Sequence, residues 1–310
     1  MREKTTEIVE EIKKVICGKD EVIRLILQSI LAGGHVLMED VPGVGKTTMA
    51  LSFAKTMGLD YGRVQFTPDV LPSDITGFSL LDPETRTMKY QKGAVFHNLF
   101  LADELNRASS RTQSALLEAM EEGQVTVDDK TYPLPKPFVV IATQNPSGAS
   151  GTTLLPDSQM DRFAIRVSMG YPSLDNEIEM LTNRQNGANP LSELKPICSI
   201  EDILQMQEET SKMYVKYRVM KYIVALMDRS RNHKMLARGG SPRCTLALTA
   251  MAKAHAYMTD RDYVIPDDVK AVFPAVLCHR MLLTPEAEFK EIKTEEIAKE
   301  IIKTTLIPKE

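Results

Sequence analysis

The stretch HVLMEDVPGVGKTT, residues 35–48, joins a short apolar run to a glycine-containing loop and then to a helical segment. In that setting the backbone N–H groups of the loop and the helix N-terminus form a cradle for phosphate oxygens. Glycines at positions 43 and 45 let the backbone approach the phosphates without a Cβ in the way. Lys46 is expected to neutralise the β and γ phosphates, and Thr47 to hold Mg²⁺. The predicted nucleotide-binding residues are Pro42, Gly43, Val44, Gly45, Lys46, Thr47 and Thr48.

This loop departs from the general pattern at one position. The generic phosphate loop begins with glycine, whereas this chain has Asp40 there. A carboxylate close to phosphate oxygens would be repelled by them, so we expect the Asp40 side chain to point away from the nucleotide.

The segment NLFLADE, residues 98–104, is an apolar strand that ends in two acids. Asp103 is expected to bind Mg²⁺ through water. Glu104 is expected to orient and deprotonate the attacking water, as phosphoryl transfer requires when the nucleophile is not a substrate hydroxyl. Acid pairs are also common at exposed strand ends, and only the preceding phosphate loop favours the catalytic interpretation.

A third motif, FVVIATQNP at residues 138–146, is a buried strand that ends in polar residues. Asn145 could hydrogen-bond the γ-phosphate or the lytic water, although an Asn-Pro pair by itself merely marks a turn. The order of phosphate loop, acid pair and polar strand end is typical of additional-strand P-loop ATPases. The guanine-reading pattern Asn-Lys-x-Asp does not occur.

Short apolar runs alternate with helical segments through the first half of the chain. This alternation predicts a parallel sheet with crossover helices, an α/β fold whose ligands bind beyond the carboxyl ends of the strands. Two helices precede the sheet, the second with a possible cap at Asp20. The expected strands cover residues 35–38, 64–66, 99–102, 138–142 and 164–167.

After Pro172 helical stripes recur and strand-like runs disappear. We therefore expect an α/β nucleotide-binding core at residues 1–172 and an all-helical domain at residues 173–310. Helix starts are suggested at Ser199, at Ser241-Pro242 and at Pro266. Two hairpins within the first half, near residues 77–89 and 124–132, are not needed to complete the sheet.

The bulk properties restrict the class of protein. A chain of 310 residues exceeds the usual single-domain size, and its 43% hydrophobic content is ordinary for a globular protein. A net charge of −4 argues against a dedicated nucleic-acid binder. The four cysteines lack metal or redox spacing, and no apolar run approaches a signal sequence or a membrane span, so we expect buried thiols and a cytoplasmic location.

Six motifs together resemble the MoxR family of AAA+ ATPases, and the similarity spans nearly the whole chain. It implies a hexameric ring, a helix-2 insertion near residues 72–92, a pre-sensor hairpin near residues 123–137 and a helical lid at residues 173–310. The motifs are EDVPG (39–43), GAVF (93–96), ADELNRA (102–108), LLEAMEE (116–122), ATQNP (142–146) and LPDSQMDRF (155–163).

The resemblance also implies roles for individual residues. Asn145 corresponds to sensor 1, and Arg162 to an arginine finger that acts in the neighbouring subunit's site. Arg243, in the stretch GSPR at 240–243, corresponds to sensor 2 and would project from a capped helix start toward phosphate. Gly18 belongs to a stretch that resembles the lining of the adenine pocket, although a glycine between two helices is also an ordinary stop signal.

Other basic residues have a simpler interpretation. Arg107 and Arg111 follow the acid pair and could serve a neighbouring subunit's site, but most such residues are surface charges. The run Arg229, Arg231, Lys234 and Arg238 is expected to be a solvated face of the lid.

The preferred function is a chaperone-like, Mg²⁺-dependent ATPase that remodels or matures another protein. The resemblance implies that a client or adaptor partner can carry a von Willebrand factor A domain. The net charge and the short apolar runs lead us to expect no nucleic-acid partner and no membrane insertion. One alternative is the ATPase subunit of a metal chelatase-like complex. The other is a nucleotide-gated scaffold with little turnover, which the presence of Glu104, Asn145 and Arg162 argues against.

Overall fold

A five-stranded parallel sheet forms the centre of the computed structural model, which describes residues 1–145, 155–185 and 189–308. The strand order is β2-β5-β8-β1-β9, so the chain crosses over between non-adjacent strands, as the alternating pattern predicted. Every expected strand is present, with ends shifted by up to three residues. The strands are β1 (Val36–Glu39), β2 (Tyr61–Gln65), β5 (Leu99–Asp103), β8 (Val139–Gln144) and β9 (Ile165–Val167).

Successive residues of the central strands contribute to two different apolar clusters, because side chains alternate between the faces of a sheet. Leu99 and Leu101 join the cluster that includes α1 (Arg2–Lys13), α2 (Asp20–Leu31) and α3 (Lys46–Thr56). Phe100 and Ala102 pack instead on the side of α4 and α5. Both faces of the sheet are therefore covered, which explains the continuously apolar strands. The helices of the second face are α4 (Pro72–Thr76) and α5 (Ser110–Glu122).

Side-chain caps begin several helices where the sequence indicated. Ser199 and Asp202 form a reciprocal capping box at α9 (Ile200–Ser211), and Ser241 accepts from the Cys244 N–H at α11 (Pro242–Met258). The expected cap at Asp20 was wrong. Asp20 is the first helical residue of α2, Lys19 holds the cap position without a side-chain hydrogen bond, and the Asp20 carboxylate pairs with Lys13.

The second half is mainly helical, but the expectation that strands disappear there was wrong. Two short pairs occur, one parallel between β10 (Tyr214–Val215) and β12 (Tyr263–Val264), and one antiparallel between β11 (Leu236–Arg238) and β13 (Leu282–Leu283). Strands of two or three residues are too short to show a two-residue period. The other helices are α7 (Leu174–Thr182), α8 (Pro190–Glu193), α10 (Tyr217–Arg231), α12 (Pro266–Leu277), α13 (Pro285–Phe289) and α14 (Thr294–Thr304).

One apolar cluster connects the two halves. It runs from α1 and α2 through one face of the sheet into α10, α11, α12 and α14. All four cysteines are buried free thiols, as expected. The helices of the described residues are too short or too polar to cross a membrane.

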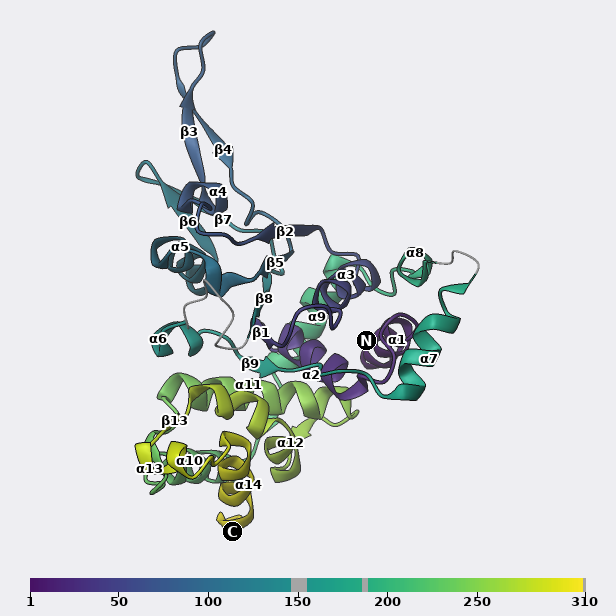
Figure 1. Cartoon of the computed structure of the whole chain (residues 1–310), viewed down its shortest axis with the longest axis vertical. Coiled ribbons are helices and arrows are strands. Elements are labelled where there is room, and N and C mark those ends of the chain that lie inside the picture. The colour runs from purple at the N-terminus through teal and green to yellow at the C-terminus, as the bar shows by residue number, and fades with distance from the viewer. Residues whose placement is uncertain (146–154, 186–188, 309–310) are drawn as a thin grey trace.

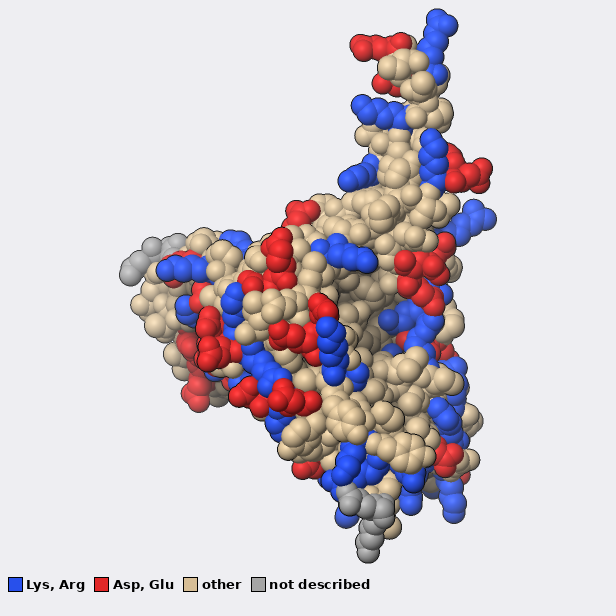
Figure 2. Space-filling view, turned by 180° about the vertical axis from the view of Figure 1, so that it is seen from behind, with Lys and Arg blue, Asp and Glu red and all other residues tan. Residues whose placement is uncertain are grey.

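Two hairpins lie outside the central sheet, as predicted. One consists of β3 (Gly77–Leu81) and β4 (Met88–Lys92), and the other of β6 (Gln124–Val127) and β7 (Lys130–Pro133). The β3–β4 hairpin projects from the body as an arm (Figures 1 and 2). Tyr90 of the arm stacks on Tyr132 of the second hairpin with ring centroids 3.9 Å apart, so the two hairpins are joined near their bases.

Candidate nucleotide site

The predicted phosphate loop connects β1 to α3. Gly43 and Gly45 have φ values of 86° and 97°, in the left-handed region that favours glycine. A Cβ on Gly43 would meet no other atom within 4 Å, so at this position the backbone conformation requires glycine, not close packing. Gly45 is the residue before the first turn of α3, and Lys46 begins that helix. The N-terminus of α3 therefore lies at the loop, where its unpaired N–H groups favour an anion.

Lys46 is largely buried and lies at the centre of a polar network. Its Nζ donates to the carbonyl oxygens of Asp40 and Val41 and, at 3.2 Å, to Oδ1 of Asn145. The amide of Asn145 in turn donates to Oε1 of Glu104 at 3.4 Å. Burial lowers the pKa of Lys46, and the nearby charges of Asp40, Asp103 and Glu104 oppose that shift. The fold thus brings three residues from three separate predicted motifs into one connected network.

The two acids follow β5 and have different surroundings. Asp103 accepts from the Thr143 hydroxyl at 2.6 Å and from the Arg63 guanidinium at 2.7 Å. Glu104 has a left-handed backbone conformation, with φ of 57°, and its N–H donates to the Thr143 hydroxyl oxygen. Its Oε2 pairs with Arg107 at 2.7 Å. Arg107, expected as a surface charge, is therefore a partner of the candidate base.

Arg63 and Thr143 were missed by the sequence analysis. Arg63 lies on β2, two residues before Gln65, the register partner of Asp103. Thr143 lies on β8, the other neighbour of β5. Their contacts depend on which strands are adjacent, and the strand order is not visible in local sequence patterns. Pro146, the last residue of the predicted third motif, lies outside the described residues.

Asp40 has partners in the segment after β9. Its carboxylate accepts from the Ser168 hydroxyl at 2.9 Å, from the Gly170 N–H at 3.1 Å and from the Met169 N–H. Both carboxylate oxygens are thus hydrogen-bonded within the protein. Asp40 consequently ties the start of the phosphate loop to the segment that leads into α7.

A cavity of about 550 Å³ adjoins the phosphate loop. Gly18 is not among the residues that line it, although both of its neighbours are. A Cβ on Gly18 would come within 1.9 Å of the Asn176 side chain on α7, and its φ is 66°. Gly18 therefore allows the α1–α2 connection to approach α7. The lining includes Val15, Ile16, Cys17, Lys19, Gly43, Val44, Gly45, Thr48, Met169, Tyr171, Pro172, Met180, Leu181 and Arg184.

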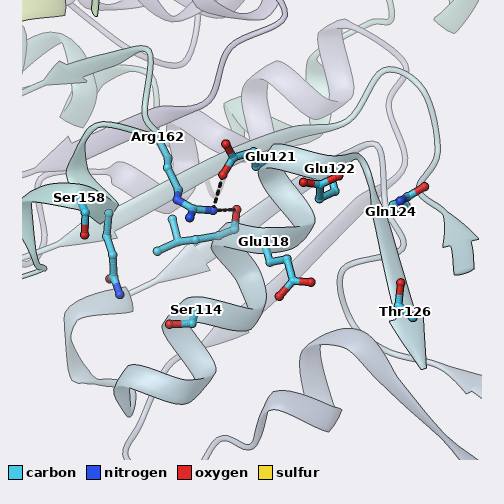
Figure 3. A pocket seen from close by; sticks show the side chains of 10 residues that line it. Ser114, Glu118, Glu121, Glu122, Gln124, Thr126, Ser158 and Arg162 are labelled. Carbon is cyan, nitrogen blue, oxygen red and sulfur yellow. Dashed lines mark hydrogen bonds and ion pairs between the residues drawn. The ribbon is translucent and has the colours of Figure 1, made fainter. Parts of the chain in front are cut away.

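Arg162 follows the short helix α6 (Asp157–Met160) and points toward the C-terminal end of α5 (Figure 3). It donates to the Leu117 carbonyl oxygen at 2.8 Å and pairs with Glu121 at 2.8 Å. Arg243 pairs with the other carboxylate oxygen of Glu121. The two arginines thus share one acid at a cavity of about 570 Å³ that Arg162 and Glu121 line.

Arg231 and Arg238 of the basic run in the lid are exposed, as expected, and each also has a partner within the protein. Arg231 donates to the Gly240 carbonyl oxygen at 2.8 Å, and Arg238 pairs with Asp157 at 2.8 Å.

Comparison with known proteins agrees with this arrangement. Residues 35–165 match the ATPase family associated with various cellular activities (AAA), and residues 228–301 match the AAA lid domain. The chain is 39% identical to Chaperone MoxR1 of Mycobacterium tuberculosis, over 96% of this chain and 81% of that protein. It is 46% identical to YeaC of Bacillus subtilis, over 97% of this chain and 93% of that protein.

A crystal structure of a candidate ATPase from Cytophaga hutchinsonii has the same fold. It superposes with a TM-score of 0.91 at 39% identity and covers 99% of this chain, which in turn spans 96% of that one. The predicted phosphate loop, acid pair and polar strand end follow β1, β5 and β8, at the carboxyl edge of the parallel sheet. The chain belongs to the MoxR family of AAA+ ATPases.

Proposed function

We propose that this chain hydrolyses ATP to ADP and phosphate with Mg²⁺ and uses the reaction to remodel or mature a partner protein. The observation that carries the proposal is the hydrogen-bonded chain from Lys46 through Asn145 to Glu104. It joins the predicted phosphate-binding cation to the predicted base through the predicted sensor. A contact between Asn145 and the γ-phosphate would therefore also affect the position of the Glu104 carboxylate.

The donor chemistry near Lys46 fits Mg²⁺. Thr47 follows Lys46 in the first turn of α3, and the Asp103 carboxylate is close enough to Lys46 to affect its pKa. A hydroxyl, a carboxylate, phosphate oxygens and water form the oxygen set that Mg²⁺ prefers. When bound, the ion would offset negative charge on the phosphates.

Each residue of the network has one proposed role in turnover. Lys46 neutralises the β and γ phosphates, and the N–H groups of the loop and of α3 bind their oxygens. Glu104 orients the attacking water and accepts its proton, while Asn145 fixes the position of that carboxylate. Arg107 holds Oε2 of Glu104 at 2.7 Å, so the carboxylate keeps one orientation.

We further propose that Arg162 and Arg243 serve the nucleotide of a neighbouring subunit in a homo-oligomeric, six-membered ring. Both arginines contact Glu121 on α5. A guanidinium that reaches across a subunit interface can raise the rate of phosphoryl transfer by a factor of roughly 10³ to 10⁵. This geometry favours a shared role for the two arginines over separate sites.

The partner is proposed to be a client or adaptor protein, with a von Willebrand factor A domain in the adaptor, in the cytoplasm. One relative bears the name Chaperone MoxR1, which supports the chaperone-like part of the proposal. The projecting arm offers exposed apolar side chains for contact with such a client: Phe78, Leu80, Leu81 and Met88.

The proposal is tested by phosphate release from mixed rings. Glu104→Gln should retain ATP but turn over about a hundredfold more slowly, because a positioned base is lost. Arg162→Ala should also bind ATP and turn over slowly. In a mixture, an Arg162→Ala subunit with intact Glu104 receives Arg162 from a Glu104→Gln neighbour, so activity should return.

Two outcomes would contradict the proposal. A parent chain that releases phosphate no faster than Glu104→Gln is a scaffold and not an ATPase. If mixtures never exceed the activity of the separate variants, although co-purification of differently tagged variants shows that mixed rings form, Arg162 does not act in the neighbour's site.

A further inference from the structure

The carboxylate of Asp161 joins the two segments that carry Arg162 and Arg243. Its Oδ1 accepts from Nε of Arg280 at 2.7 Å, and its Oδ2 accepts from the Ser241 hydroxyl at 2.8 Å. Asp161 immediately precedes Arg162, and Ser241 lies two residues before Arg243. A single side chain therefore connects the backbones that present both arginines.

Arg280 binds the segment that carries Arg162. It ends the short 3₁₀ helix η3 (Cys278–Arg280), and its side chain is only 3% exposed. Its guanidinium donates to the carbonyl oxygens of Asp161 at 3.1 Å, Phe163 at 2.6 Å and Ala164 at 3.1 Å, and to that of Val276. The backbone on both sides of Arg162 is thus fixed to the lid by one buried cation.

Ser241 holds the second segment. It caps α11 by accepting from the Cys244 N–H at 3.0 Å, and it donates its only hydroxyl proton to Asp161. Arg243 lies in the first turn of that helix. Because the cap and the Asp161 contact use the same oxygen, the start of α11 cannot shift without disturbing Asp161.

We propose that Asp161, Arg280 and Ser241 are positioning residues that set Arg162 and Arg243 together for the neighbouring subunit's phosphate. The inference rests on the proposed function, in which these arginines act across the interface. The three residues do not touch the nucleotide. They connect both arginine-bearing segments to the lid. A shift of the lid would therefore move both guanidinium groups away from the neighbouring phosphate together.

The alternative is that the ion pair between Asp161 and the buried Arg280 only stabilises the fold. A general loss of stability would impair a subunit both as a donor of arginines and as a receiver of them. A positioning role affects only donation, because Lys46, Asn145 and Glu104 belong to a separate network of the same subunit.

Asp161→Asn separates the two readings, because the amide keeps the shape of the side chain but loses its charge. Rings of this variant should bind ATP with unchanged affinity and release phosphate about tenfold to a hundredfold more slowly, as expected for misplaced reacting groups. Mixed with Glu104→Gln, which donates intact arginines, the variant should recover activity. Mixed with Arg162→Ala, which cannot donate, it should not.

The outcomes are distinguishable from failure of the proposed function. If Arg162→Ala and Glu104→Gln do not complement each other, the action across the interface is wrong and this inference falls with it. If they complement, but Asp161→Asn fails to recover with Glu104→Gln or does recover with Arg162→Ala, only the positioning role is wrong.

Asp268→Asn is the matched control. Asp268 is an acid that likewise pairs with an arginine, Arg261, but its contacts are with α11 and the segment before α12. It should lower the melting temperature while the turnover of folded rings stays normal. If Asp161→Asn does not fold, Ser241→Ala should show the donor defect and Ser241→Thr, which keeps the hydroxyl, should reverse it. Equal activity of the two Ser241 variants would overturn the inference.

Discussion

His35, immediately before β1, is a buried imidazole whose tautomer is fixed by its partners. Its Nδ1 accepts from the Val140 N–H at 3.0 Å, so its Nε2 carries the proton and donates to the Met120 carbonyl oxygen at 3.1 Å. Protonation of Nδ1 would set two N–H groups against each other. Burial lowers the pKa of His35 to about 4, despite the hydrogen bond to Met120 that raises it.

This gives a pH-dependent contribution to stability. An unfolded histidine titrates near pH 6.5. Between that value and pH 4 the unfolded chain binds a proton that folded His35 does not, so the free energy of unfolding falls as the pH falls. The loss from this group over that window is about 3 kcal/mol.

We predict that His35→Gln flattens this dependence, because an amide can accept from Val140 and donate to Met120 at any pH. Urea denaturation of parent and variant between pH 8 and pH 4 measures the effect. Above about pH 7.5 the two curves should stay parallel, since histidine is neutral in both states. Curves that stay parallel down to pH 4 would contradict the assignment.

At the residue scale, the sequence predicted the members of the site better than their partners. Lys46, Glu104 and Asn145 each end or begin an element in a recognisable order, and the fold brings them together. The bond between Arg107 and Glu104 was missed, because a positive charge three residues after an acid is ordinary in sequence. The contact between Arg243 and Glu121 of α5 was also missed, because the two residues lie far apart in the sequence.

At the scale of elements, the two hairpins differ from the sheet strands in their burial and in their strand pairing. The central strands are buried on both faces, while β3 and β4 are largely exposed and pair only with each other. Tyr90, near the base of the arm, donates to the Thr76 carbonyl oxygen and stacks on Tyr132. The outer part of the arm, residues 80–89, should therefore be removable without loss of the fold.

We predict that replacing residues 80–89 by an Asn-Gly turn leaves the fold and ATP affinity intact but abolishes coupling to the client. The turn would join Ser79 to Tyr90, which are register partners, and so preserves the base of the hairpin. Thermal melting, nucleotide titration and capture of the client by Glu104→Gln in ATP measure the three effects. A control replaces only residues 83–86 and should keep client capture.

The outcome that would contradict this reading is unfolding of the shortened chain, which would make the outer arm part of the core. The strands of the central sheet were predictable because their apolar runs alternate with helical segments in a regular order. The pairs β10–β12 and β11–β13 were not, because their few residues are held by packing between helices.

At the scale of the whole molecule, the proposed active site is incomplete in a single chain. The guanidinium of Arg162 is bound to α5 and not to the Lys46 network, so hydrolysis should depend on assembly. We predict that phosphate release per chain falls on dilution, while ATP binding measured at equilibrium does not. Light scattering at each concentration gives the assembled fraction, and turnover should follow it.

Arg162→Ala supplies the control for that dilution series. Its low turnover should not change with concentration, because assembly brings it no guanidinium from Arg162. Parent turnover that stays constant as rings dissociate would show that each chain hydrolyses ATP alone.

The apolar cluster that joins α1 and α2 to the sheet and to the lid helices has a practical consequence for handling the protein in pieces. A fragment limited to residues 35–165 would lack both N-terminal helices and the lid. The sheet face that carries Leu99, Leu101 and Ile141 would keep α3 but lose the other helices that cover it, so part of this apolar surface would meet water. Such a fragment should self-associate through that face, and it would precipitate on expression even though it contains every residue of the phosphate loop.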